Sequence, residues 1–424
     1  MILCSVIFAI TILGMIICVI TNASFKKVPL YLVITSLGAI LVLALQVLPI
    51  KVAIKGLWNS SSVNPIKILV LFISMTSLSV FLDEVGFFTF LACFTLKKAG
   101  ISQKKLFLLL FIVVSVLTIF TSNDIIILTF TPFICYFCKR AKLNPIPYLI
   151  EEFVSANTFS MMLLIGNPTN IYLSLFKNVN FGEYFSVMFL PAIAGGITAF
   201  LILFFIFRKQ LETPISFTYE DFKPNFPLVI IGSSFLALCT LLLAIAQFIN
   251  LDMWLISLSF ALALIVVVLL YKLVKKEPMQ DLARTIKRLP WGLIPFMLSM
   301  FILVESLNYC EVTKVFAKVI PKGAFSYGIV STLSANLLNN IPMSVLFGSI
   351  INFARVSRVE IFATIIGSNI GAYLTPIGAL AGIMWLNILG EHNVKISFLK
   401  FVYYGIIIAI PTLLISLLSL IIVI

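Results

Sequence analysis

The chain has 424 residues, of which 61% are hydrophobic and only 11% are charged, and this composition excludes a soluble globular domain. We therefore predict an all-α polytopic membrane protein that lies in a lipid bilayer. The formal net charge of +13 does not indicate a nucleic-acid partner, because the basic residues lie in short loops between apolar runs, where they set membrane topology.

Three apolar runs near the amino terminus are long enough to serve as membrane-spanning scaffold helices. We predict them at residues 2–21, 28–50 and 65–82. The first lacks a basic start and a small-residue cleavage site, so it is interpreted as a retained helix rather than a signal peptide. Asp83 and Glu84 interrupt the third, and an interfacial connector follows over 87–98. These two acids are interpreted either as groups that couple moving and static parts or as carboxylates at the end of a span.

Residues 106–138 form an apolar run with Thr121-Ser122-Asn123-Asp124 near its midpoint. Each arm is too short to cross a bilayer comfortably and leave room for a turn. We predict a re-entrant hairpin with its polar tip inside the protein. One long span kinked at Asn123 is the alternative.

A broken helix is predicted over 147–176, because Gly166-Asn167-Pro168-Thr169-Asn170 stands in the middle of an otherwise apolar run. Pro168 removes a backbone donor, and Gly166 permits non-helical dihedral angles. In hydrocarbon, the freed backbone groups are tolerated only where they are buried in protein or face a wet cavity, so this break predicts half of a binding site. Glu151 and Glu152 are expected to cap the N-terminal turn of this helix.

The order of elements repeats in the second half of the chain. Asn369 and Gly378 have the same spacing as Asn157 and Gly166, Ser334-Ala335-Asn336 corresponds to Thr121-Ser122-Asn123, and Glu305 falls where Asp83 fell. Corresponding broken segments in two halves indicate a transporter site. We predict two repeats, each with three scaffold helices, a re-entrant hairpin, a broken helix and a final helix. They comprise residues 1–207 and 228–424, with a cytoplasmic linker over 208–227, a second hairpin over 324–351 and a second broken helix over 361–389.

The distribution of positive charge predicts the topology. Placing the amino terminus outside the cell puts most of the 29 lysines and arginines, Lys26 and Lys27 among them, on the cytoplasmic side together with the 208–227 linker. The two hairpins then enter from opposite sides, so the repeats have inverted topology, as alternating access requires. We expect a multi-pass protein of the cell membrane.

The interrupted segments contain no lysine or arginine, and their polar groups are amides, hydroxyls, backbone and one acid. Such an inventory suits a small hydrated solute. It predicts neither a catalytic residue nor a metal or cofactor. Cys135 and Cys138 are interpreted as buried small hydrophobes. Asp124 is expected to bind the coupling ion, because an acid within a membrane is usually functional; an acid at the interface is the alternative. The asparagines line the site or, alternatively, cap helices. The expected substrate-binding residues are Asn123, Asn167, Thr169, Asn336, Asn339, Asn340, Thr375 and Gly378, and the expected coupling residues are Ser122 and Asp124, with Asp83, Glu84 and Glu305 as further candidates.

These motifs resemble the ion transporter superfamily that contains arsenite efflux permeases, sodium/proton antiporters and divalent-anion/sodium symporters, and the similarity is greatest to the arsenite permease branch. It is carried by Leu82–Phe88, Ser122-Asn123-Asp124, Gly166–Asn170, Asn336–Pro342 and Ile366–Gly371. The resemblance implies a mobile transport domain, made of two hairpins and two broken helices, that moves against a static scaffold, often in a homodimer. Whether a soluble ATPase partner docks is left open.

Three functions are compatible with these features. The first is efflux of arsenite or antimonite coupled to proton entry through Asp124, since a neutral trihydroxy acid fits a site without fixed positive charge. The second is sodium-coupled import of an anion such as a dicarboxylate, because Gly166–Asn170 resembles anion permeases more than arsenite permeases. Sodium/proton antiport is a variant of this second function. The third is a channel, which the duplicated layout disfavours.

Overall fold

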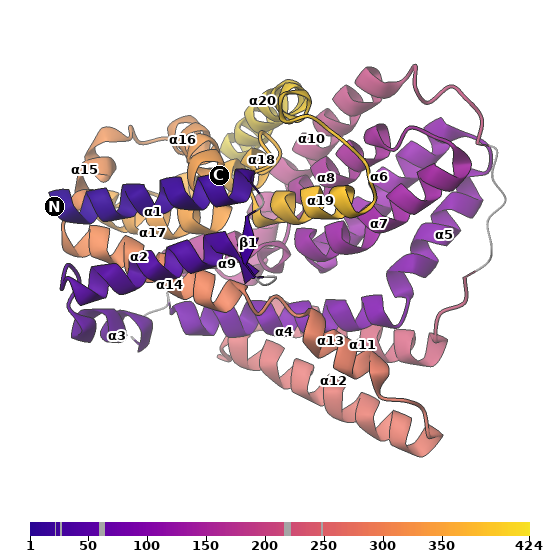
Figure 1. Ribbon diagram of the computed structural model, residues 1–424, viewed down its shortest axis with the longest axis horizontal. Helices are drawn as coiled ribbons and strands as arrows, with labels where there is room; N and C mark the ends of the chain where they lie inside the picture. Colours follow the sequence, from indigo (N-terminus) through magenta and orange to yellow (C-terminus); the bar gives the residue numbers. More distant parts are fainter. Residues whose placement is uncertain (22, 26–27, 59–63, 216–221, 247–248) are drawn as a thin grey trace.

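The computed structural model describes residues 1–424 except 22, 26–27, 59–63, 216–221 and 247–248 (Figure 1). Lys26 and Lys27, which entered the topology prediction, and the middle of the predicted linker lie outside the described residues. Over the described part of the chain, the structure is almost entirely helical, and seven helices are long and apolar enough to cross a membrane. The predicted class, an all-α polytopic membrane protein, is confirmed.

The helices of the first half follow the predicted order, with a short antiparallel strand pair, β1 (Ser24–Phe25) and β2 (Val28–Pro29), between the first two. They are α1 (Ile2–Ile20), α2 (Leu30–Ala44), α3 (Ile50–Trp58), α4 (Pro65–Glu84), α5 (Phe87–Ala99), α6 (Gln103–Phe120), α7 (Asn123–Ala141), α8 (Ile146–Phe159), α9 (Pro168–Leu175) and α10 (Phe181–Phe207).

The second half has the same succession of long, short and interrupted helices. They are α11 (Phe226–Ile245), α12 (Met253–Lys275), α13 (Gln280–Arg288), α14 (Leu293–Tyr309), α15 (Val312–Val319), α16 (Ala324–Leu338), α17 (Asn340–Ala354), α18 (Arg358–Gly371), α19 (Leu380–Glu391) and α20 (Phe398–Val423). The described helices from α11 onward thus correspond one by one to those from α1 onward. The relative orientation of the two halves in a membrane stays a prediction.

The predicted span over 28–50 is wrong in its length. The helix α2 stops at Ala44, Gln46 adopts a left-handed conformation with φ of 56°, and a separate short helix, α3, begins directly after Pro49. A left-handed residue ends a helix, and proline is well placed just before or at the start of the next one. The sequence analysis did not identify α3 as a separate helix, nor α13, which has the same place in the order of the second half.

The helices α6 and α7 form a hairpin, as their contacts with α8 show. The start of α6 lies beside the start of α8, because Tyr148 donates a hydrogen bond to Gln103 Oε1 at 2.7 Å. Further along, the ring of Phe111 contacts that of Phe159 at the end of α8. The helix α6 therefore runs parallel to α8.

The second arm runs the other way. Asn123, the first residue of α7, bonds to Asn157 near the end of α8, whereas Thr131 further along α7 bonds to Glu152 nearer the start of α8. Because α6 is parallel to α8 and α7 is antiparallel to it, the chain turns back at Thr121 and Ser122. This arrangement is a hairpin and not one long kinked helix.

The second hairpin, α16 and α17, turns at Asn339, which has a positive φ of 73°. Tyr327 of α16 packs edge-on against Phe347 of α17, as expected for two arms that fold back on each other. Asn336 lies within α16 and donates to Thr332 O one turn earlier at 2.8 Å, so the helix continues through it. The predicted match of Ser334-Ala335-Asn336 with the first tip is therefore wrong. Asn340 is the residue that opens the second arm, as Asn123 does in the first hairpin.

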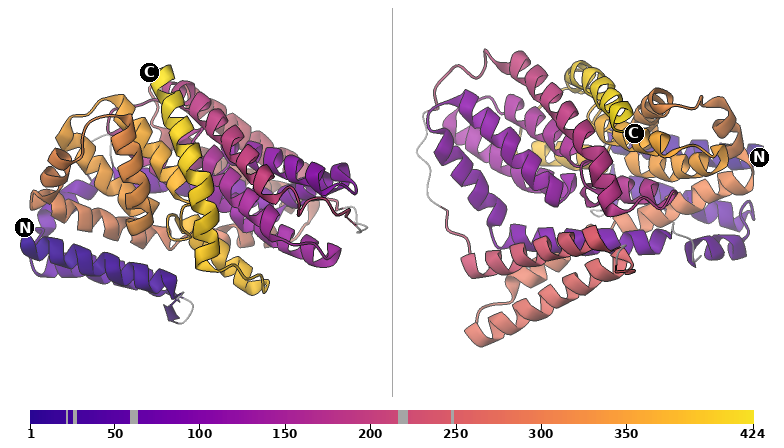
Figure 2. Two further views of the ribbon diagram at one scale, coloured as in Figure 1. Left: turned by 90° about the horizontal axis from the view of Figure 1, so that it is seen from above. Right: turned by 180° about the vertical axis from the view of Figure 1, so that it is seen from behind.

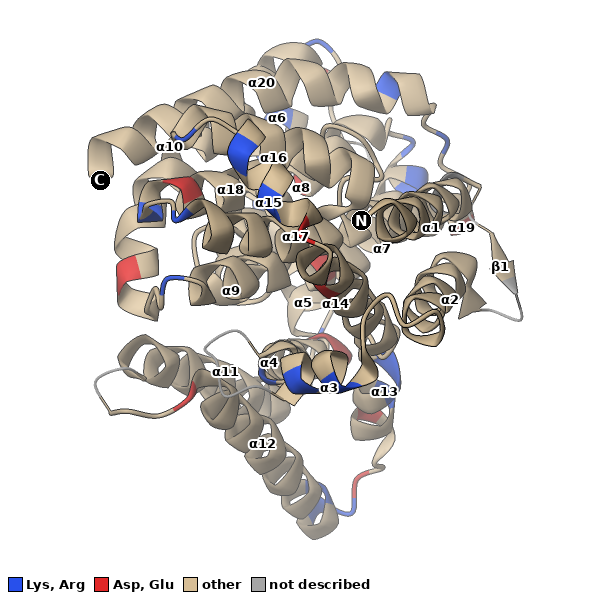
Figure 3. Ribbon diagram, turned by 90° about the vertical axis from the view of Figure 1, so that its left-hand side faces the viewer, with Lys and Arg blue, Asp and Glu red and all other residues tan. Residues whose placement is uncertain are grey.

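The two halves pack together at α4, where α11, α12 and α13 of the second half run beneath this helix of the first half (Figures 1 and 2). Charged residues lie mainly toward helix ends and in loops (Figure 3). At the end of α4, Arg288 of α13 donates to Asp83 Oδ2 at 2.6 Å and to Glu84 Oε1 at 2.5 Å. Arg284 Nε adds a bond to Glu84 Oε2 at 2.9 Å. This ion-pair network fastens α13 to α4.

Candidate functional site

The first interruption separates α8 from α9 and is completely buried. Between them lie Ser160 to Leu163, a 3-10 turn η1 (Leu164–Gly166) and Asn167. Pro168 fits the first position of α9, and Asn167 Oδ1 caps this helix by accepting from Thr169 N at 3.1 Å. A Cβ on Gly166 would lie 2.2 Å from the carbonyl oxygen of Ser160, so only glycine allows this close approach.

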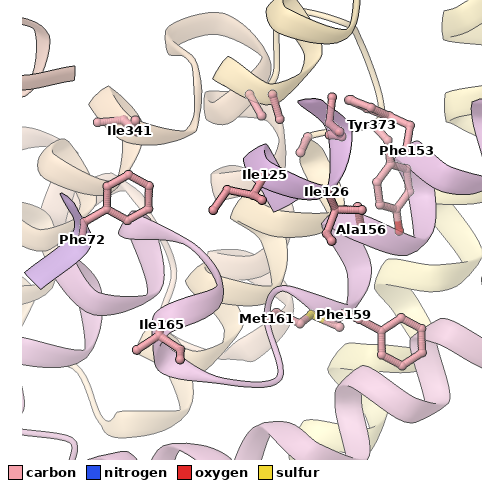
Figure 4. Packing of buried hydrophobic residues seen from close by; sticks show 14 of the residues in the cluster. Phe72, Ile125, Ile126, Phe153, Ala156, Phe159, Met161, Ile165, Ile341 and Tyr373 are labelled. Atoms are coloured by element: carbon pink, nitrogen blue, oxygen red, sulfur yellow. The ribbon is translucent and has the colours of Figure 1, made fainter. Parts of the chain in front are cut away.

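Apolar side chains surround this buried interruption. Ile125 and Ile126 of α7 lie toward Ala156 of α8, and Met161 and Ile165 belong to the unwound segment itself (Figure 4). The polar backbone is thus enclosed by protein, which satisfies the condition for non-helical structure at membrane depth.

The second interruption, between α18 and α19, has the same local geometry. Gly378 N–H donates to Thr375 O at 3.1 Å, as Gly166 N–H donates to Leu163 O at 3.1 Å. A Cβ on Gly378 would lie 2.6 Å from Gly371 O. Ala379 precedes its helix with extended φ and ψ of −145° and 157°, as Asn167 does with −153° and 139°.

The first interruption bonds to Asn369, a buried residue in the last turn of α18, just before the second interruption. Its Oδ1 accepts from Ser160 Oγ at 2.8 Å and from Asn167 Nδ2 at 3.2 Å. Its Nδ2 donates to Asn170 Oδ1 at 2.8 Å. One amide from the second half therefore joins three polar groups of the first. Asn369 served the sequence analysis only as evidence of duplication, and its spacing relative to Asn157 was the signal that could have identified it as part of the site.

The first hairpin tip joins the same network. Asn123 Nδ2 donates to Asn157 Oδ1 at 3.0 Å, and Ser160 Oγ donates to Asn157 O at 2.9 Å. Asn123 is 1% exposed, and within the described part of the chain its Oδ1 has no hydrogen-bond partner. The same holds for Ser122 Oγ, so two free acceptor oxygens lie at this tip.

The second hairpin holds the second interruption in place. Asn336 Nδ2 donates to Gly371 O at 2.9 Å, and its Oδ1 accepts from Thr375 N at 3.0 Å and Thr375 Oγ1 at 2.6 Å. Asn339 Nδ2 donates to Ile377 O at 3.0 Å. Asn340 is also buried, and over the described residues its Oδ1 has no partner. The structure thus brings the predicted amides of this half together with Thr375 and Gly378.

Asp124 lies in the first turn of α7, directly after the tip, and is half-buried. Among the described residues, no hydrogen bond or ion pair to its carboxylate is found, while its charge acts on the Tyr31 hydroxyl of α2. A carboxylate at the N-terminal turn is favoured by the helix dipole. The arrangement leaves Asp124 free to bind a cation or a proton.

Three other candidate acids lie away from the interruptions. Asp83 and Glu84 bind the arginines of α13, as described above. Glu305 accepts from Asn308 Nδ2 at 3.0 Å within α14. The structure does not bring these acids into the asparagine network.

Glu151 and Glu152 contradict the expectation that they cap α8. This helix begins at Ile146, so both residues lie in its second turn, where backbone N–H groups already have partners within the helix, and both are 0% exposed. Thr131 Oγ1 of α7 donates to Glu152 Oε1 at 2.9 Å and Oε2 at 3.0 Å. Two buried acids in the broken helix are the residues that the sequence analysis missed, and the apolar residues on both sides of them were the available signal.

Comparison with known proteins agrees with this architecture. A family model described as citrate transporter matches residues 15–359. An "Arsenical pump membrane protein" of Escherichia coli is 26% identical over 407 residues, which covers 91% of this chain and 92% of that protein. A protein of the same name from Yersinia enterocolitica is 27% identical, and the match covers 86% of this chain and 86% of that protein. A "Putative arsenical pump membrane protein" of Bacillus subtilis is 25% identical, and the match covers 78% of this chain and 81% of that protein. The chain is a multi-pass membrane protein of the ion transporter superfamily and belongs to the citrate transporter family.

Proposed function

We propose that this protein is a secondary active transporter that exports arsenite or antimonite in exchange for protons by alternating access. The observation that carries the proposal is a buried amide network in which Asn369, in the helical turn before the second unwound segment, bonds to the first unwound segment. Unwound segments of two repeats that meet inside the protein are the typical site of a secondary transporter.

The chemistry of this network favours a small neutral oxyacid. Its described side chains are amides and hydroxyls, and neither interruption contains a lysine or arginine that would fix an anion. A trihydroxy acid offers donors and acceptors to such groups, and the unpartnered oxygens of Ser122, Asn123 and Asn340 can accept hydrogen bonds from it. The names of the arsenical pump relatives point to the same class of solute.

Asp124 is the proposed coupling residue. It stands next to the free oxygens of the first tip, and over the described residues no basic group neutralises it. An acid that faces a transport site alternates between a charged and a neutral form at moderate cost when its exposure to water changes. Proton entry through Asp124 would then accompany exit of the neutral substrate.

We further propose that the two repeats are inverted, with the amino terminus outside the cell and the linker inside. The excess of lysine and arginine on the linker side supports this orientation. The protein would then lie in the plasma membrane, where efflux removes the toxic solute from the cell.

Sodium-coupled import of an anion such as a dicarboxylate is the second candidate, and sodium/proton antiport is its variant. Asn123 and Asn340 are the first residues of α7 and α17, the second arms of the two hairpins, and each has an unpartnered Oδ1 among the described residues. Hard cations prefer such oxygen ligands. The description of the matching family model as citrate transporter supports an anionic solute.

Uptake into everted membrane vesicles separates these functions. Proton-driven arsenite accumulation that a protonophore abolishes supports the first, and accumulation of a dicarboxylate that needs sodium supports the second. Arsenite flux that never exceeds equilibration would contradict a coupled carrier and indicate a channel.

The variant Asp124→Asn tests the coupling residue. The amide is isosteric but cannot take up a proton, so we expect gradient-driven accumulation to be lost while the thermal stability in detergent stays near that of the wild type. Glu391→Gln, at the exposed end of α19, is the matched control and should transport normally. Uphill transport by Asp124→Asn would remove this residue from the mechanism.

A further inference from the structure

Glu151 is a carboxyl group with no polar partner in the middle of the protein. It is 0% exposed, and neither of its oxygens has a hydrogen-bond partner among the described residues. Glu152, the next residue, is equally buried but is held by Thr131. An ionised carboxylate that is buried without a partner is very costly, whereas the protonated acid is far less so.

The charged and titratable groups on the elements around α8 do not neutralise Glu151. Cys135 and Cys138 of α7 and Tyr148 of α8 are neutral in their ordinary forms, and Glu152 adds a second acid. The helix α20 also packs against α8, through the rings of Phe401 and Phe153. The charged residues of α6, α7, α10, α18, α19 and α20 lie at or near helix ends. They are Lys104, Lys105, Asp124, Lys139, Arg140, Glu183, Arg358, Glu360, Glu391 and Lys400.

A chain of polar side chains leads from this buried acid to the surface at the linker. Tyr148, which lies three residues before Glu151 and so on the same face of α8, donates to Gln103 Oε1 at 2.7 Å. Gln103 Nε2 donates to Thr213 O at 2.7 Å and Thr213 Oγ1 at 2.5 Å. Exposure increases along this chain, since Tyr148 is 0% exposed, Gln103 is 3% exposed and Thr213 is exposed.

The start of the linker is fixed at this point and does not hang free. Ile215 N donates to Ile101 O at 2.8 Å, and Pro214 pairs with Ser102 in an isolated bridge. Residues 213–215 therefore lie against the start of α6. The polar chain ends at Thr213, within this fixed part of the linker.

We propose that Glu151 is a second proton-binding carboxyl, which holds a proton in the resting protein and exchanges it with the linker side along Tyr148, Gln103 and Thr213. The inference rests on the proton coupling proposed above and adds a site to it. In the step itself, one proton from the linker-side solution forms an O–H bond on Glu151 Oε, and the same bond breaks when the proton returns.

The position of Glu151 connects this site to the transport site. Glu152 lies five residues before Asn157, or about 7.5 Å along α8 at the usual rise per residue. The interface between α7 and α8 is thus tied at two levels, by Thr131 to Glu152 and by Asn123 to Asn157. A proton that enters or leaves the Glu151–Glu152 pair changes the charge at one end of this interface, while Asp124 lies at the other end.

Infrared spectroscopy of the full-length protein in lipid vesicles tests the proposal without any substrate. A protonated carboxyl has a C=O stretching band separate from that of a carboxylate. We expect the wild type to show this band at neutral pH, Glu151→Gln to lose the component assigned to it, and the exposed control Glu391→Gln to keep it. Spectra of Glu151→Gln that match the wild type would overturn the proposal.

The route is tested by the rate at which the band changes after a jump to alkaline pH. Tyr148→Phe removes the hydroxyl that bonds Gln103, so we expect the same band but a changed rate of proton loss; an unchanged rate would overturn the route. These readouts do not need arsenite. If the wild type fails to accumulate arsenite, only the proposed function is contradicted. If the infrared spectrum of Glu151→Gln matches that of the wild type, only this inference is contradicted.

Discussion

The two interrupted helices have the same local backbone geometry but are stabilised by different partners. The first interruption, from Ser160 to Asn167, is fully buried and is held by Asn369 of the opposite half. The second is held by Asn336 of its own half, and Thr375 within it is half-exposed. The second interruption also has one bond across the halves, from Thr158 Oγ1 to Tyr373 Oη at 3.3 Å. We expect from the difference in partners that the first interruption serves as a fixed junction between the halves, and that the second changes shape together with its hairpin.

Asn369→Ala should have the largest effect on this comparison. The change leaves Asn167 Nδ2 and Asn170 Oδ1 without a partner among the described residues, whereas Ser160 Oγ keeps its bond to Asn157 O, and a buried polar group without its bond costs about 1–3 kcal/mol. We expect a loss of stability of about 3 kcal/mol or more, since two buried groups lose their bonds at one site. Thermal unfolding in detergent measures it.

The exposed Asn352→Ala, on α17, is the matched control and should change stability little. If Asn369→Ala is no less stable than this control, the first interruption is not held from across the halves, and the contrast with the second disappears.

The glycines provide an intermediate test. A Cβ at position 166 meets a backbone oxygen at 2.2 Å, and one at position 378 meets a backbone oxygen at 2.6 Å and Asn336 Oδ1 at 2.9 Å. The first interruption is buried throughout, whereas the second is partly exposed at Leu374 and Thr375. The first should therefore yield less, and we expect Gly166→Ala to lose about 1–3 kcal/mol of stability and Gly378→Ala to lose less. Thermal unfolding of both variants gives the order, and a larger loss for Gly378→Ala would reverse the proposed roles.

The positions of the interruptions could be predicted from the sequence because proline and glycine act locally. Pro168 favours the start of α9, and Gly166 and Gly378 allow the close backbone contacts inside the two interruptions. The hairpin tip at Ser122 followed from a polar cluster in an apolar run. These features depend on neighbours along the chain.

The partners of the polar side chains could not be predicted in this way. Asn369 bonds to residues of the other half, and nothing in its immediate sequence indicates this contact. Glu151 and Glu152 were assigned to a helix start because acids are favoured there, but tertiary packing places them in the second turn and buries them. Asn336 was matched with Asn123 of the first tip, but it lies within α16 and the second hairpin turns at Asn339, because an asparagine is compatible with both a helix and a turn.

Thr375→Val should have the smallest effect on stability, and it tests function most directly. The change removes the hydroxyl that donates to Asn336 Oδ1 but leaves the backbone bond from Thr375 N, so we expect a loss of about 0.5–1 kcal/mol.

Thr169→Val is the counterpart of this change in the first interruption. The Thr169 hydroxyl donates to Asn167 Oδ1 at 3.1 Å, and the Thr169 backbone N–H donates to the same oxygen. Thr169 is 1% exposed and its hydroxyl also accepts from Ser368 Oγ at 3.3 Å, so its loss should cost more stability.

The two threonine variants differ in what they should do to transport. Thr375 is partly exposed, so we expect a solute to reach its hydroxyl and Thr375→Val to raise the substrate concentration for half-maximal uptake at nearly unchanged stability. Thr169→Val should lower stability and leave that concentration close to the wild-type value in the protein that remains folded. Measuring both quantities in both variants separates a group that binds substrate from one that holds the junction. If the two variants behave alike, the interruptions share one role, and the mobile part of the protein must be sought in the hairpins themselves.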